Sequence, residues 1–102
     1  MEAHVHFNQL TPAEAERLAI LSEEMGECIQ AIGKINRHGY ESKYPPETGP
    51  TNRAKLEKEL GDVMLTVYTM IAKKDIDPEV IGMRVAEKHE TIKPYLHHQD
   101  SL

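Results

Sequence analysis

Apolar residues recur at helical spacing along the first half of the chain. When residues are placed at about 100° intervals, one stripe collects five of them: Leu18, Leu21, Met25, Ile29 and Ile32. We expect this stripe to be the main core face of a helix. Its start is marked by Thr11 as N-cap, Pro12 at the first helical position and Glu14, which completes a capping box. The pattern predicts a helix over residues 12–37.

A second apolar stripe predicts a helix over residues 52–74, capped by Thr51 or Asn52. The stripe consists of Leu56, Leu60, Val63, Val67 and Ile71. Between Leu60 and Ala72 this segment is apolar on almost all sides, which is typical of a helix buried by several neighbours. Two neighbouring helices of one subunit cannot cover so wide a surface, so we expect a homodimer or a homotetramer.

Proline and glycine mark the remaining elements. Residues 38–51 hold Pro45, Pro46, Gly49 and Pro50 and are predicted to form a loop. This loop is either a plain connector or, through Tyr40, Lys43 and Tyr44, a segment that closes over a ligand.

A third helix over residues 78–93 is predicted from Asp77 as N-cap, Pro78 at the first position and Pro94 as the stop. The expected fold is therefore all-α: one domain over residues 1–102 with three main helices, a helical bundle completed by oligomerisation.

Composition narrows the function classes. A chain of 102 residues has a limited core of its own. The net charge of -5, without a lysine-rich or arginine-rich run, argues against a nucleic-acid partner. The single cysteine, Cys28, excludes an intramolecular disulfide and fits a reducing compartment. No signal-like start and no run approaching about 20 apolar residues is present, so no membrane partner and a cytoplasmic location are expected.

Acidic residues are paired three positions apart on each of the first two helices. The pairs are Glu24 with Glu27, and Glu59 with Asp62. Residues at this spacing share a helix face, with Cβ atoms roughly 5–6 Å apart. Taken alone, such a pair is commonly a solvated surface pair. The first pair, however, shares its sector with Ile20 and other apolar side chains, and the second lies beside the core stripe with Thr66.

A cluster of these carboxylates requires positive charge. Like charges about 5 Å apart repel by roughly 3 kcal/mol at an effective dielectric near 20. Four of them together would consume most of a typical stability of about 5–15 kcal/mol. Carboxylates without histidine or thiolate suit Mg²⁺, Ca²⁺ or Mn²⁺. The pattern therefore predicts a divalent cation between the two helices.

The two acidic segments resemble a known signature. Glu23-Glu24-x-x-Glu27 followed by Glu59-x-x-Asp62 is similar to the motif of the MazG-type all-α NTP pyrophosphohydrolases, over roughly residues 15–93. The resemblance implies hydrolysis of a (d)NTP to the monophosphate and pyrophosphate, in dimers or dimers of dimers. It implies Mg²⁺ as the cofactor, with Mn²⁺ as a substitute. The catalytic residues that it implies are the metal ligands Glu24, Glu27, Glu59 and Asp62, and Glu23 as a supporting or water-orienting acid.

Substrate contacts are less well marked. Ile20 and Thr66 share the sectors of the carboxylates, and Arg84 and Lys88 on the third helix are candidates to reach a phosphate. A solvated basic helix end, matched to the helix dipole, is the more common explanation of Arg84 and Lys88. The 31 residues between Glu27 and Glu59 are a long separation for the family, so the loop contains an insertion or an extended helix end.

Three other classes of protein are alternatives to this resemblance. Phosphoribosyl-ATP pyrophosphohydrolases are small helical proteins with related acidic motifs, and they are the first alternative. A non-enzymatic helical interaction module is the second. A ferritin-like di-iron protein would need Glu-x-x-His motifs, and the sequence has none.

Overall fold

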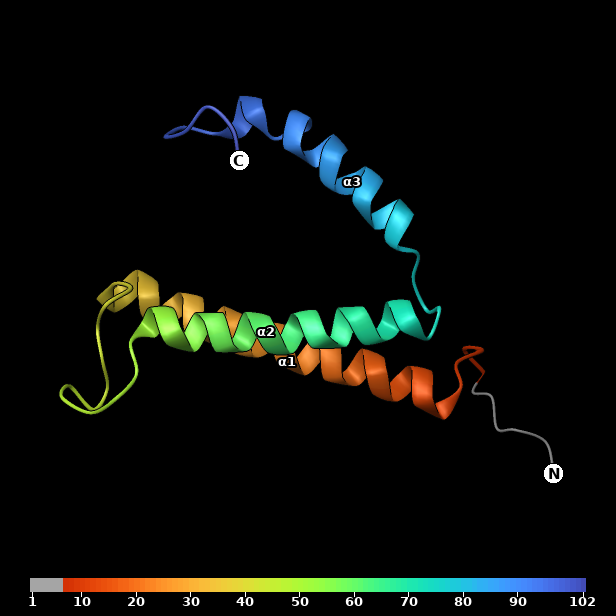
Figure 1. The fold of residues 1–102 in the computed structure, drawn as a ribbon, viewed down its shortest axis with the longest axis horizontal. Coiled ribbons are helices and arrows are strands. Elements are labelled where there is room, and N and C mark those ends of the chain that lie inside the picture. The colour runs from red at the N-terminus through yellow and green to blue at the C-terminus, as the bar shows by residue number, and fades with distance from the viewer. Residues whose placement is uncertain (1–6) are drawn as a thin grey trace.

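Three α-helices form the regular structure of the part of the chain that is described, residues 7–102 of a computed structural model. They are α1 (Pro12–His38), α2 (Asn52–Ala72) and α3 (Pro78–Thr91), followed by the short 3₁₀ turn η1 (Lys93–Tyr95) (Figure 1). No strand is present among these residues. The prediction of an all-α fold with three main helices is confirmed. None of these helices combines the length and apolar character that a membrane span requires.

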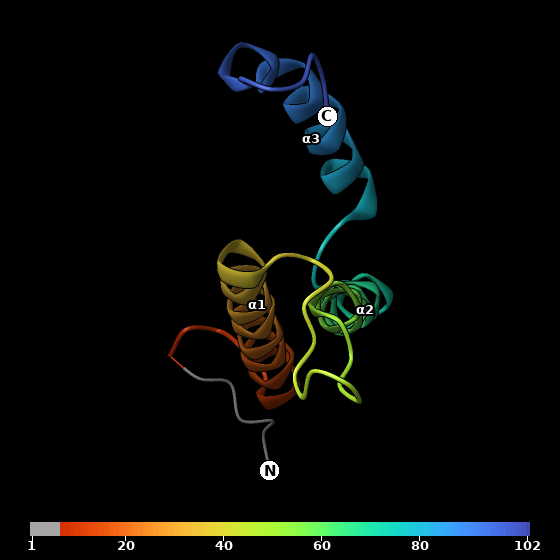
Figure 2. The same cartoon turned by 90° about the vertical axis from the view of Figure 1, so that its left-hand side faces the viewer.

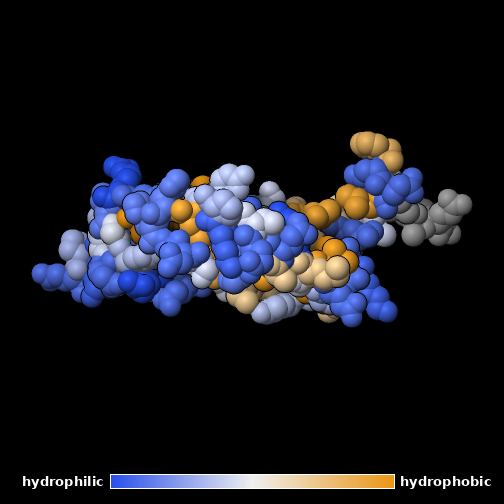
Figure 3. Space-filling view, turned by 90° about the horizontal axis from the view of Figure 1, so that it is seen from above, coloured by the Kyte–Doolittle hydropathy of each residue, from blue (hydrophilic) through white to orange (hydrophobic). Residues whose placement is uncertain are grey.

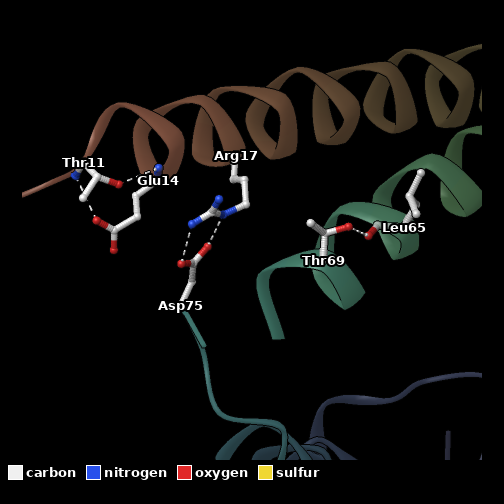
Figure 4. Close-up of polar contacts among 6 residues, drawn as sticks. All are labelled: Thr11, Glu14, Arg17, Leu65, Thr69 and Asp75. Atoms are coloured by element: carbon white, nitrogen blue, oxygen red, sulfur yellow. Dashed lines mark hydrogen bonds and ion pairs between the residues drawn. The ribbon is translucent and has the colours of Figure 1, made fainter. Parts of the chain in front are cut away.

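Each helix begins with a side-chain cap. The Thr11 hydroxyl accepts a hydrogen bond from the Glu14 amide at 3.1 Å, and the Glu14 carboxylate accepts one from the Thr11 amide at 2.8 Å (Figure 4). This is the capping box expected from the sequence. Thr51 caps α2, and the Asp77 side chain accepts from the Glu79 amide at the start of α3.

The helix ends differ slightly from those read from the sequence. Helix α2 ends at Ala72 rather than near Lys74, because Lys74 adopts a left-handed conformation with φ of 65°. Helix α3 ends at Thr91, and the chain tightens into η1 around Pro94. Such endings redirect the backbone after each helix.

Helices α1 and α2 form an antiparallel pair, joined by the loop and packed along their length (Figures 1 and 2). The residues buried between them are mostly small or polar: Cys28, Ala31, Asn52, Thr66 and Met70. Small side chains allow two helix axes to approach closely, so the contact line follows these residues.

The stripe expected to be the main core face of α1 was therefore placed wrongly. Four of its members are exposed in the single chain: Leu18, Met25, Ile29 and Ile32. Leu60 of the α2 stripe is exposed as well. By helical spacing, both stripes lie roughly 80° from the contact line, and the antiparallel arrangement turns them to the same side of the pair. Seen from the α3 side, the molecular surface is mostly hydrophilic, with hydrophobic patches between the hydrophilic side chains (Figure 3).

Helix α3 packs against neither α1 nor α2 in the described part of the chain. It runs on one side of the pair, whereas the loop lies on the other (Figures 1 and 2). The radius of gyration is 18.0 Å, compared with about 13 Å for a compact domain of this length. A bidentate ion pair fixes the linker before α3, since Arg17 donates to Asp75 at 2.6 and 2.9 Å (Figure 4).

The loop between α1 and α2 is held by its backbone. The amides of Asn52 and Arg53 donate to the carbonyls of Ser42 and Tyr40 at 2.9 and 2.8 Å. The Asn52 side chain donates to the Gly39 carbonyl at 3.1 Å. Lys43 and Thr51 form an isolated antiparallel bridge. The loop is thus tied to the first turn of α2.

Candidate metal centre and its surroundings

Three carboxylates meet between α1 and α2. Glu24 comes from the middle of α1, and Glu59 and Asp62 come from one face of α2. One oxygen of each carboxylate lies within 4.8 Å of an oxygen of the other two, and all three residues are half-buried. The sequence pattern predicted this meeting, because each residue occupies the sector of its helix that faces the partner helix.

Small neighbours allow the carboxylates to come this close. Glu24 lies one turn before Cys28, and Ala31 follows on the same face; both are buried against α2. On α2, Thr66 is buried one turn after Asp62. Their short side chains leave room for acidic side chains to reach across the contact line.

Burial and neighbouring charges raise the proton affinity of two groups here, the Glu24 carboxyl and the Cys28 thiol. Burial raises the pKa of the Glu24 carboxyl above 4.5, and the charges of Asp62 and Glu59 raise it further. The pKa of the Cys28 thiol is raised by its burial and then by the same carboxylates. Cys28 therefore stays a neutral thiol, and the space between the helices attracts positive charge.

Lys58 supplies part of that positive charge. Its ammonium group lies 3.3 Å from Glu59 Oε1 and 3.4 Å from Asp62 Oδ2, and these two contacts raise the pKa of Lys58. The Lys58 side chain is 69% exposed, so solvent screens the contacts. Lys58 lies one turn before Asp62 on α2, whereas no lysine or arginine lies one turn after it.

Glu27 and Glu23 do not belong to the group. Glu27 is exposed and, together with Glu59, lines a small neighbouring cavity of about 100 Å³. Glu23 is exposed on α1 beside Glu24. The roles of Glu27 as a metal ligand and of Glu23 as a supporting acid stay predictions.

The four residues predicted to contact substrate are scattered. Thr66 is buried, and its hydroxyl donates to the Asp62 carbonyl at 3.0 Å, so it is occupied by its own helix. Ile20 is exposed on α1. Arg84 pairs with Glu87 on α3, and Lys88 lines a groove on the same helix. Because α3 turns away from the pair, the structure does not bring Arg84 or Lys88 to the carboxylates of the same chain.

A second cavity, with a volume of about 390 Å³, was not predicted from the sequence. It lies where the end of α1, the loop and the start of α2 meet, and it is lined by Lys34, Arg37, His38, Ser42, Lys43, Tyr44, Asn52 and Lys55. Helical spacing does contain a signal for it. Lys34 lies two turns after Glu27, and Lys55 lies one turn before Glu59.

The donor set suits a hard divalent cation. Carboxylate oxygens are the only ligand atoms in the group of Glu24, Glu59 and Asp62. Oxygen ligands of this kind favour Mg²⁺ and Mn²⁺, whereas zinc and copper sites usually include histidine or cysteine. The three carboxylates are therefore candidate ligands for such an ion.

Comparisons with known proteins give one match. A family model described as the MazG nucleotide pyrophosphohydrolase domain matches residues 13–97. Comparisons with curated proteins and with solved structures found no match.

Proposed function

The chain belongs to the MazG nucleotide pyrophosphohydrolase family, and from this premise we propose that it converts a (d)NTP to the (d)NMP and pyrophosphate in the presence of Mg²⁺. The observation that carries the proposal is the meeting of Glu24, Glu59 and Asp62 between α1 and α2. Family membership supports the reaction class, and this group of carboxylates supports a location for the reaction between α1 and α2.

The carboxylates have a defined part in the proposal. Glu24, Glu59 and Asp62 hold Mg²⁺, and Glu27 joins them from the neighbouring turn of α1, where it lies beside Glu59. Bound Mg²⁺ supplies charge neutralisation for the triphosphate and lowers the pKa of a coordinated water. Lys58 would give up its contacts with Glu59 and Asp62 to a bound divalent cation, because solvent screens its exposed ammonium group.

The remaining acid positions the nucleophile. Glu23, exposed next to Glu24, orients the attacking water. Positioning and electrostatic stabilisation account for most of the barrier reduction expected in phosphoryl chemistry, so the chain itself needs no covalent intermediate.

A second copy of the chain completes the bundle. The apolar stripes of α1 and α2 are open on one side in the single chain, and α3 stands clear of both helices. A homodimer that buries these stripes is the minimum assembly, and a homotetramer would extend it.

Product analysis tests the reaction. Purified protein with Mg²⁺ or Mn²⁺ is incubated with a panel of ribo- and deoxyribonucleoside triphosphates, and with phosphoribosyl-ATP. We expect a monophosphate and pyrophosphate from at least one (d)NTP, and none when EDTA is present. Release of orthophosphate and a diphosphate would reject the reaction class, and cleavage of phosphoribosyl-ATP alone would favour the first alternative. A non-enzymatic module would cleave nothing.

A further inference from the structure

The cavity at the loop end of the helix pair is lined by cations. Lys34 and Arg37 come from the end of α1, Lys43 from the loop and Lys55 from the start of α2. No carboxylate lines it among the described residues. Within residues 7–102, none of the four forms an ion pair. Four positive charges therefore face one cavity, and no carboxylate of the described residues pairs with any of them.

This concentration is unusual in so acidic a chain. The net charge is -5, and other basic side chains do find carboxylates: Arg17, Arg53, Lys58, Arg84 and Lys93. Like charges that converge on one cavity repel each other, so they favour an anion between them. The positive charge of the cavity is therefore complementary to an anionic ligand.

The cationic cavity adjoins the small cavity beside the carboxylate site, which one member of that site, Glu59, lines. Lys34, Asn52 and Lys55 line both it and the small cavity that contains Glu27 and Glu59. Along α1, the ten residues from Glu24 to Lys34 correspond to roughly 15 Å, and along α2, the four residues from Lys55 to Glu59 correspond to roughly 6 Å. The groove between the helices thus changes from negative in the middle of the pair to positive at the loop.

The alternation of charge matches a polyphosphate that is partly bound to metal. A triphosphate carries more negative charge than one divalent cation neutralises, and its remaining oxygens accept hydrogen bonds from lysine and arginine. We infer that the loop cavity binds the terminal phosphates of the nucleotide, and hence the pyrophosphate product, through Arg37, Lys43 and Lys55. This inference rests on the proposed function, and it moves phosphate binding from α3 to the loop.

The loop is built to hold these side chains. The first amides of α2 already donate to the loop carbonyls of Ser42 and Tyr40, so they are not free for an anion, and binding must come from the side chains. Asn52 is buried at the boundary of the two cavities and is fixed through its bond to Gly39. A wall that is ordered before the ligand arrives lowers the entropic cost of binding.

Calorimetric titration with inorganic pyrophosphate in EDTA tests the inference without the metal. The proteins are the parent, Arg37→Gln, Lys43→Gln and the double variant. Lys73→Gln, which removes an exposed charge outside the cavity, is the matched control. We expect the parent and the control to bind alike, each cavity substitution to weaken binding about tenfold or more, and Asp62→Asn to retain binding.

The outcomes separate this inference from the proposed function. If pyrophosphate fails to bind the parent, or binds the double variant as tightly, the inference is wrong. If nucleotides are hydrolysed but Arg37→Gln leaves KM unchanged, the function stands and the cavity is not its phosphate site. Arg37-dependent binding of pyrophosphate without hydrolysis of any nucleotide would keep the anion site and reject the proposed reaction.

Discussion

Glu24 is the residue whose titration reports most directly on the carboxylate group. Its raised pKa means that the ionised form is unfavourable in the metal-free fold. The stability contribution of this shift is fully present below the ordinary pKa of 4.5, and it is lost as the pH rises through the raised value. At neutral pH, the metal-free protein therefore carries an uncompensated charge at this position.

The substitution Glu24→Gln should remove that penalty while keeping the shape. We expect the metal-free variant to melt at a higher temperature than the metal-free parent at pH 7. The difference should shrink as the pH falls towards and below 4.5, because the carboxyl then becomes protonated in both the folded and the unfolded chain. Added Mg²⁺ should raise the melting temperature of the variant less than that of the parent.

Thermal melts over pH 4.5–7 check this prediction, with Glu16→Gln as the control because Glu16 is exposed on α1. Equal melting temperatures of Glu24→Gln and the parent at pH 7, both in EDTA, would show that Glu24 is not under strain from its neighbours. Lys58 will reduce the size of the effect, since it already offsets part of the charge of Glu59 and Asp62.

At the scale of elements, the loop depends on Gly49. A Cβ added there would overlap the backbone carbonyl of Tyr44 and come within 2.6 Å of the Pro45 nitrogen. Neither is the flexible end of a side chain, so Gly49→Ala must displace the backbone. We expect the loop wall to shift and pyrophosphate binding in EDTA to fall, while stabilisation by Mg²⁺ at the carboxylates is kept.

Gly33→Ala is the matched control for the loop variant. A Cβ at Gly33 meets nothing within 4 Å, and the residue is exposed inside α1. This change should leave pyrophosphate binding intact and raise stability by about 0.5–1 kcal/mol. Unaltered pyrophosphate binding in Gly49→Ala would mean that the loop backbone does not position the cavity. Calorimetry and thermal melts on the same samples provide both measurements.

Local signals predicted the elements well, and long-range contacts account for what was missed. The caps at Thr11, Thr51 and Asp77 depend on residues a few positions away, so the sequence contained them in full. The contact line between α1 and α2 depends on which sector faces which neighbour. The most hydrophobic sector of α1, around Ile29, is turned away from α2. Hydrophobicity alone does not determine which surface covers such a sector.

The candidate site shows the same division. Glu59 and Asp62 were recognisable from their spacing within one helix, and Glu24 from its sector. The cationic cavity combines two helix ends with a loop, and no periodicity describes a loop. The prediction that Arg84 contacts the substrate depended on the course of the chain after Asp75, which no local pattern determines. In the structure, α3 does not pack against α1 or α2, so it carries Arg84 away from the carboxylates.

At the scale of the whole molecule, the open apolar surface predicts an oligomer. Ile29 is 70% exposed in the single chain and belongs to the α1 stripe. Ile29→Glu should therefore be tolerated by a monomer but should disrupt an assembly that buries the stripe. We expect light scattering to report at least a dimer for the parent at micromolar concentration, and a lower mass for Ile29→Glu.

Leu65→Glu is the control for this substitution, because Leu65 is 67% exposed and helical spacing places it away from the stripe. It should retain at least the dimer. A parent mass of 11.6 kDa, or an unchanged mass of Ile29→Glu, would contradict the assembly.

The central claim is that the carboxylates between α1 and α2 form a metal site for nucleotide pyrophosphohydrolysis. The most direct measurement is pyrophosphate release with saturating Mg²⁺ and nucleotide, compared between the parent and Asp62→Asn at equal concentrations of folded protein. We expect Asp62→Asn to lower the rate about 100-fold or more, because electrostatic stabilisation is usually the largest catalytic contribution. Full turnover by Asp62→Asn would show that Glu24, Glu59 and Asp62 are not a shared metal site.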